Sequence, residues 1–104
     1  MSKQLMRMTV RLNPKDTKVA FLRLDGVGIR QFEQLAVQYR RIHKVESATK
    51  SDIIRWILAQ YTVTHCDLSS LQQYCETQHI SLLRLFELAM CVAMQKHLGS
   101  IVQL

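Results

Sequence analysis

The chain has 104 residues and carries 14 lysines and arginines against eight aspartates and glutamates, a net charge of +6. A chain of this length forms one domain with a modest core, which many such chains complete by dimerising. No signal peptide is apparent, the most apolar stretch (82–94) is too short to cross a bilayer, and three cysteines without paired spacing argue against a disulfide framework. We therefore expect a cytoplasmic protein that is not bound to a membrane.

The positive charge is confined to the first half of the chain. Residues 1–50 hold 11 lysines and arginines against four acidic residues, whereas residues 51–104 hold three against four. Such an asymmetry is typical of a surface that binds a polyanion.

Two strands are predicted near the N-terminus. Residues 5–12 alternate from Met6 on, with Met6, Met8, Val10 and Leu12 on one face and Arg7, Thr9 and Arg11 on the other. Residues 18–24 place Ala20, Leu22 and Leu24 on one face and Val19, Phe21 and Arg23 on the other. A turn signal with Pro14 separates them.

Four helices are predicted after Gly28. The first begins at Ile29, carries the apolar stripe Ile29, Phe32, Leu35, Ala36, Tyr39 and Ile42, and ends near His43 and Lys44. The second opens with a variant capping box at Thr49 and Asp52 and buries Ile53, Ile54, Ile57, Leu58 and Tyr61. Asp67 is the expected cap of a helix over 68–77, and Ser81 that of a helix ending at Leu98 before Gly99.

The last of these helices is apolar on nearly all sides between Leu82 and Met94. Such a helix must be enclosed, and a small chain has little with which to enclose it. We therefore expect a subunit interface in this region, and hence a homodimer or a higher homo-oligomer.

The order of a strand, an amphipathic helix and a capped second helix resembles the ribbon-helix-helix family of Arc- and MetJ-like DNA-binding proteins. Three segments of residues 5–61 carry the resemblance: Leu22-Arg23-Leu24-Asp25, the stripe that ends in Leu35-Ala36, and Val45 to Arg55. The resemblance implies a mostly α fold with a short β-ribbon, as an intertwined dimer with a C-terminal helical extension. Residues 1–64 would form the DNA-binding region and residues 65–104 the helical oligomerisation region.

In that family, two chains pair their strands into a ribbon that enters the major groove, and the start of the second helix anchors a phosphate. The resemblance implies base contacts by Arg7, Thr9, Arg11 and Arg23, and phosphate contacts by Lys44, Thr49, Lys50 and Ser51. Arginine bonds guanine bidentately, and free N–H groups at a helix start bind anions.

Which strand faces DNA is left open by the sequence. Ungapped alignment with the family pattern selects residues 18–24, whose outward face is poor in hydrogen-bond donors. Residues 5–12 have better chemistry but need an insertion before the helix, and we favour them because a base-reading ribbon needs donors. A third arrangement joins the two segments in a hairpin across 13–17.

Other features receive simpler explanations. Arg40, Arg41 and Lys44 suit a solvated helix end, and Trp56 suits a core or interface anchor. The candidate zinc ligands lack a paired short-spacing motif, although Cys75 and His79 lie one helical turn apart, so no cofactor is expected. These candidates are Cys66, Cys75, Cys91, His65, His79 and His97. No paired acid motif or glycine-rich phosphate loop is present, so we expect no enzyme.

The expected function is sequence-specific duplex DNA binding, as a transcriptional repressor (antitoxin-type autoregulation included) or as an accessory factor at a plasmid transfer or partition site. The alternative is a small protein–protein module, such as a phage- or plasmid-encoded inhibitor or an assembly subunit, whose basic half docks on an acidic protein. The C-terminal helices are a candidate surface for a protein partner in either case.

Overall fold

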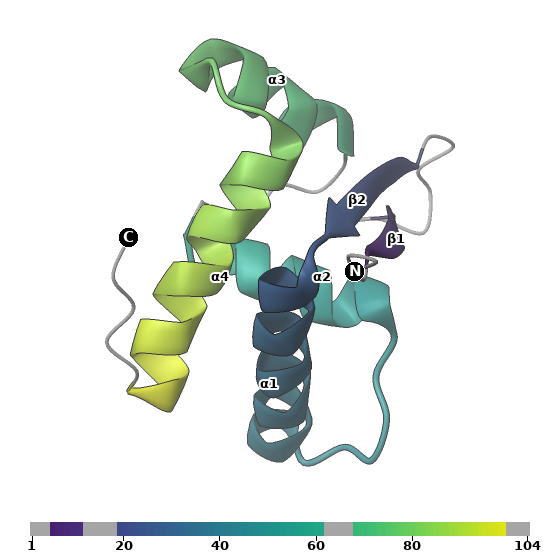
Figure 1. Cartoon of the computed structure of the whole chain (residues 1–104), viewed down its shortest axis with the longest axis vertical. Helices are drawn as coiled ribbons and strands as arrows, with labels where there is room; N and C mark the ends of the chain where they lie inside the picture. Colours follow the sequence, from purple (N-terminus) through teal and green to yellow (C-terminus); the bar gives the residue numbers. More distant parts are fainter. Residues whose placement is uncertain (1–4, 12–18, 62–67, 100–104) are drawn as a thin grey trace.

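The computed structural model describes residues 5–11, 19–61 and 68–99. Two strands and four helices follow one another along the chain: β1 (Met6–Val10), β2 (Ala20–Leu24), α1 (Gly26–His43), α2 (Lys50–Ala59), α3 (Leu68–Gln78) and α4 (Leu82–Leu98). The prediction of a mostly helical chain with a short β-ribbon is confirmed. In Figure 1, α4 lies beside α1, α2 crosses behind both, and the two strands lie at the N-terminal end of α1.

The two strands pair with each other in one antiparallel hairpin. The hairpin arrangement is therefore the one that forms, and both strands of the ribbon come from the same chain rather than from two. Its inner face packs on the helices, because Met8, Val10, Leu22 and Leu24 are all buried. The turn predicted around Pro14 lies outside the described residues.

Helix α1 begins at Gly26, three residues before the predicted start. Asp25 is its N-cap, and the Oδ1 atom accepts a hydrogen bond of 2.9 Å from the backbone N–H of Gly28. A Cβ atom on Gly28 would lie 3.3 Å from Cβ of Leu24. Gly28, after which the helix was predicted to begin, instead lies in its first turn, where the absence of a side chain lets α1 approach Leu24 of β2 closely.

Two side chains assigned to the core by periodicity are exposed. Tyr61 is 43% exposed because it follows the end of α2, where helical periodicity no longer applies. Ile42 is also 43% exposed, since it lies in the last turn of α1, which extends beyond α2 (Figure 1). The other predicted core positions of α2 are buried: Ile53, Ile54, Ile57 and Leu58.

Helix α4 is the centre of the core. It packs against α1, α2, α3 and β2 and buries Leu85, Phe86, Ala89, Met90, Ala93 and Met94. The ring of Phe86 lies 6.3 Å from that of Phe32 on α1, centroid to centroid. Much of the enclosure for which we invoked a second subunit is thus supplied by the same chain. Four apolar residues of α4 are only half-buried, namely Leu82, Leu83, Leu88 and Val92, and the oligomeric state stays a prediction.

The predicted ends of α4 are confirmed. Ser81 caps its start by accepting a hydrogen bond of 3.0 Å from the N–H of Arg84, and Gly99 ends it in the left-handed conformation at φ 62°. Asp67, the expected cap of α3, lies outside the described residues. None of the helices in the described segments is long and apolar enough to cross a membrane.

Candidate nucleic-acid interface

The outward face of the hairpin brings together the four residues predicted to contact bases. Arg7 and Thr9 project from β1 and Arg23 from β2, on the side opposite the buried residues, and Arg11 follows the end of β1. All four are exposed. We call Arg7, Thr9, Arg11 and Arg23, together with Phe21, the hairpin face. The sequence presented the two strands as competing candidates, whereas in the hairpin they share one surface.

Two arginines stand directly opposite each other on this face. The register pairs Arg7 with Arg23 and Thr9 with Phe21. Like charges at directly opposed positions of an antiparallel pair destabilise the sheet. Neither arginine forms an ion pair within the described part of the chain. The exposed Asp25, two residues after Arg23, instead caps α1 by accepting from the N–H of Gly28. The arrangement therefore favours a bound anion.

Phe21 belongs to the same surface. The alternation of the second strand placed it on the outward face with Arg23, but it was not among the predicted DNA contacts. Its side chain is 53% exposed. The guanidinium carbon of Arg7 lies 3.9 Å from the centroid of its ring, a cation–π contact between diagonal neighbours of the hairpin. The contact restricts where the Arg7 side chain points and leaves an apolar surface beside it. The signal that sequence analysis missed is that the outward positions of both strands share one face.

The predicted phosphate site at the start of α2 is built around a capping box. Thr49 Oγ1 accepts a hydrogen bond of 3.1 Å from the N–H of Asp52, and Asp52 Oδ2 accepts one of 3.3 Å from the N–H of Thr49. The hydrogen bond from Thr49 lowers the pKa of Asp52, and Arg55, which forms an ion pair with the carboxylate, acts in the same direction. The predicted box is confirmed, but it places an ionised carboxylate at the helix start. Lys50, whose side chain is exposed, is the cation nearest in sequence to the carboxylate of Asp52.

Helix α2 packs against β1, so its start and the hairpin belong to the same half of the molecule (Figure 1). Lys44 does not. It is the left-handed C-cap of α1, with φ 55°, at the end of an 18-residue helix that begins directly after β2. At 1.5 Å per residue this places Lys44 about 27 Å from the hairpin.

The positions of the described cysteine and histidine side chains do not support a zinc site. In the segments that the structure describes, no three histidine, cysteine, aspartate or glutamate side chains gather at one point. Burial raises the pKa of the Cys75 thiol, which disfavours the thiolate that a metal would need. His65 and Cys66 lie outside the described residues.

Comparisons of the chain with protein-family models, with curated proteins and with solved structures found no match. The resemblance to the ribbon-helix-helix family thus rests on the residues quoted above and on the order of the elements. A hairpin followed by helices is compatible with that family and does not establish it.

Proposed function

We propose that the chain binds duplex DNA in a sequence-specific manner and that its hairpin face enters the major groove. A two-stranded antiparallel ribbon has the width that this groove admits. In this proposal Arg7, Arg11 and Arg23 donate to guanine, and Thr9 contacts either kind of base. Phe21 packs against the C5-methyl group of a thymine beside the base that Arg7 contacts.

The observation that carries the proposal is the direct opposition of two exposed arginines, Arg7 and Arg23, neither of which forms an ion pair with a described residue. In the free protein the two charges repel each other, and a polyanion removes that repulsion. The cation–π contact of Arg7 with Phe21 supports a role in recognition, because a side chain held in place loses less entropy on binding.

The start of α2 has a lesser part in this proposal. Asp52 already occupies the helix terminus with a negative charge, so the phosphate contact falls to the side chains of Lys50 and Ser51 and to the Thr49 hydroxyl. Lys44, at the end of α1 that lies away from the hairpin, is left out of this contact. As a DNA-binding dimer, the protein would act as a repressor or as an accessory factor of a mobile element.

Gel-shift titration of the full chain with duplex DNA across a salt series tests the proposal. We expect affinity for nonspecific duplex to fall steeply with salt, and site selection from a random pool to give a preferred sequence. Arg7→Ala, Arg11→Ala and Arg23→Ala should each lower affinity for that sequence by about tenfold or more, as expected for a lost bidentate contact. Lys96→Ala removes an equal charge from an exposed position of α4 and is the matched control.

Replacing thymine with uracil in the selected site tests Phe21 separately. We expect the loss of the methyl group to weaken binding by the wild-type chain and to leave binding by Phe21→Ala unchanged. If no duplex binds even at low salt, the proposal is wrong, and the alternative of a protein partner for the basic half of the chain is the one left to test. If the hairpin variants bind like Lys96→Ala, another surface contacts the DNA.

A further inference from the structure

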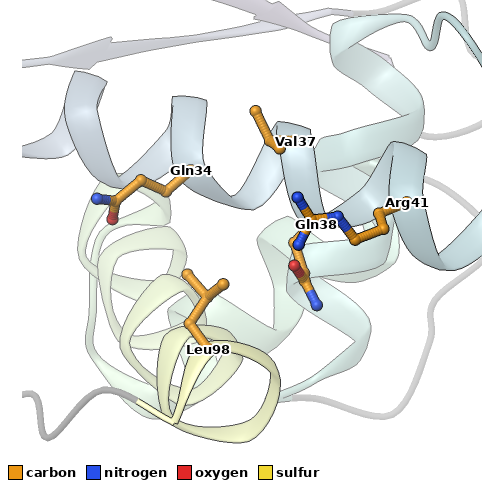
Figure 2. A pocket seen from close by; sticks show the side chains of 5 residues that line it. All are labelled: Gln34, Val37, Gln38, Arg41 and Leu98. Atoms are coloured by element: carbon orange, nitrogen blue, oxygen red, sulfur yellow. The ribbon is translucent and has the colours of Figure 1, made fainter.

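The exposed surface of α1 has two neighbouring depressions, and no residue of the hairpin lines either of them. One depression of about 350 Å³ is lined by Gln34, Val37, Gln38, Arg41 and Leu98. A second adjoins it and is lined by Arg30, Glu33, Gln34 and Val37. Figure 2 shows Leu98 of α4 pointing toward α1, between Gln34 and Gln38. We call the two depressions together the α1 groove.

The α1 groove has an apolar centre, with Arg41 on one side of it and with Glu33 and, farther out, Arg30 on the other. Val37, at its centre, is 47% exposed. Glu33 lies four residues before Val37 and Arg41 four residues after it, so the three form one line on the helix surface. The two charged residues are about 12 Å apart along the axis, which is too far for them to pair within one helix. Neither forms an ion pair with another described residue of the chain.

The order Glu33, Val37, Arg41 is complementary to itself when a second copy is rotated by 180° about an axis through Val37. If a second α1 lies antiparallel across the first with the two-fold axis at Val37, each Glu33 faces the Arg41 of the other copy. The two Val37 side chains then meet at the axis. A parallel arrangement would instead place Glu33 on Glu33. Isologous contacts of this kind are what a two-fold dimer requires, and antiparallel helices that cross at about 20° keep such positions opposite each other.

We propose that the α1 groove is the interface of a homodimer in which two copies of α1 pack antiparallel about Val37, with Glu33 of each copy paired to Arg41 of the other. Leu98 from the last turn of α4 forms one wall of the groove and covers the edge of the incoming helix. The second copy is favoured over an unrelated partner because the order of acidic, apolar and basic side chains matches itself. The proposal does not rest on DNA binding, since the groove and the hairpin face share no residue.

Sedimentation of the full chain in the absence of DNA tests the interface. We expect a reversible dimer with a dissociation constant between about 1 µM and about 500 µM, the range typical of a small interface. Val37→Glu should raise the dimer dissociation constant at least about tenfold, because it buries two carboxylates against each other at the two-fold axis. Val27→Glu is the matched control. Val27 lies on the same helix, is 55% exposed, and does not line the groove.

A charge exchange tests the predicted pairing. Glu33→Arg and Arg41→Glu should each weaken the dimer, because each places like charges opposite each other, and the double variant should recover wild-type association. All the substituted side chains are exposed, and circular dichroism shows whether each variant keeps its fold. A wild-type chain that stays monomeric overturns the proposal. So does equal weakening by Val27→Glu and Val37→Glu, or a double variant as weak as its parents.

Discussion

The imidazole of His97 packs on the indole of Trp56, with ring centroids 4.8 Å apart and planes tilted by 39°. The Nε2–H group of the same histidine donates to Oε1 of Gln60, 3.0 Å away, and its carbonyl accepts from Nε2 of Gln38 at 3.3 Å. Through these contacts the last turn of α4 is joined to α2 and to α1. Tyr39 packs edge-on against the same indole, at 5.6 Å. A single histidine therefore links three helices.

We predict that the protein loses stability as the pH falls toward 5. Burial lowers the pKa of His97, and the neighbouring charge of Lys96 lowers it further. Because its pKa in the folded state lies below the unfolded value of about 6.5, the stability it contributes is fully present above that value and is lost as the pH falls through the folded pKa. Asp52, whose pKa is also lowered, loses its contribution only below about pH 4, in a separate window.

Urea unfolding followed by the emission of Trp56, the one tryptophan of the chain, measures this dependence. His97→Gln should flatten the free energy of unfolding between about pH 8 and about pH 5. His43→Gln, which changes the histidine that packs edge-on against Trp56, is the matched control for the loss of an imidazole beside the indole. A slope that is the same in wild type and in His97→Gln would show that other groups produce it.

The second prediction concerns the enclosure of α4. Phe86 is completely buried and packs on Phe32, so Phe86→Ala should lower the free energy of unfolding by about 3–5 kcal/mol. Because both rings belong to one chain, the loss should be the same at low and high protein concentration. Chemical denaturation at two concentrations a hundredfold apart measures it. A loss that grows on dilution would mean that Phe86 acts through a subunit interface.

The third prediction concerns the capping box of α2. Thr49→Ala removes the hydroxyl that accepts from the N–H of Asp52 and should lower the free energy of unfolding by about 1 kcal/mol. Thr49→Ser keeps the hydroxyl and should stay close to wild type. Ser47→Ala changes an exposed residue of the preceding loop and is a control for the loss of a hydroxyl as such. If Thr49→Ala and Thr49→Ser are equally stable, the hydrogen bond contributes nothing measurable.

Much of the fold was predictable because its signals are local. The alternation around Met8 and Leu22, the hydroxyl caps at Thr49 and Ser81, and Gly99 each depend on a few neighbouring residues, and the structure has them as expected. The predicted start of α1, Ile29, was wrong because glycine has a low helix propensity, so Gly26 and Gly28 were placed before the helix. Asp25 and the close approach of Leu24 override that propensity.

The candidate site was predictable only in part, because it depends on pairing between distant segments. Periodicity placed Arg7 and Arg23 on the outward faces of their strands, but the strand register decides that they stand opposite each other. The same register brings Phe21 under Arg7. The packing around α4 also depends on residues distant in sequence. The apolar surface of α4 must be buried, and the sequence alone does not say whether the residues that bury it come from the same chain.

The last prediction concerns the opposition of Arg7 and Arg23. If the hairpin is arranged for an anion, the free protein should become more stable when one of the two charges is removed. Arg23→Gln should raise the free energy of unfolding by about 0.2–1 kcal/mol at low salt, the usual size of a cross-strand pair, and added salt should diminish the gain by screening the wild-type repulsion. Arg7→Gln should gain less, since it also removes the cation–π contact with Phe21.

The same Arg23→Gln variant should bind duplex DNA more weakly, so that stability and affinity change in opposite directions. Duplex DNA should in turn stabilise the wild-type chain more than the variant, because the stabilisation of the folded state by a ligand grows with the logarithm of its affinity. Denaturation at low and high salt, with and without duplex, measures all three effects, and Lys96→Gln controls for the loss of a charge elsewhere. A variant that is less stable than wild type at low salt would show that Arg23 contributes a favourable contact. The repulsion would then no longer support an anion site at the hairpin.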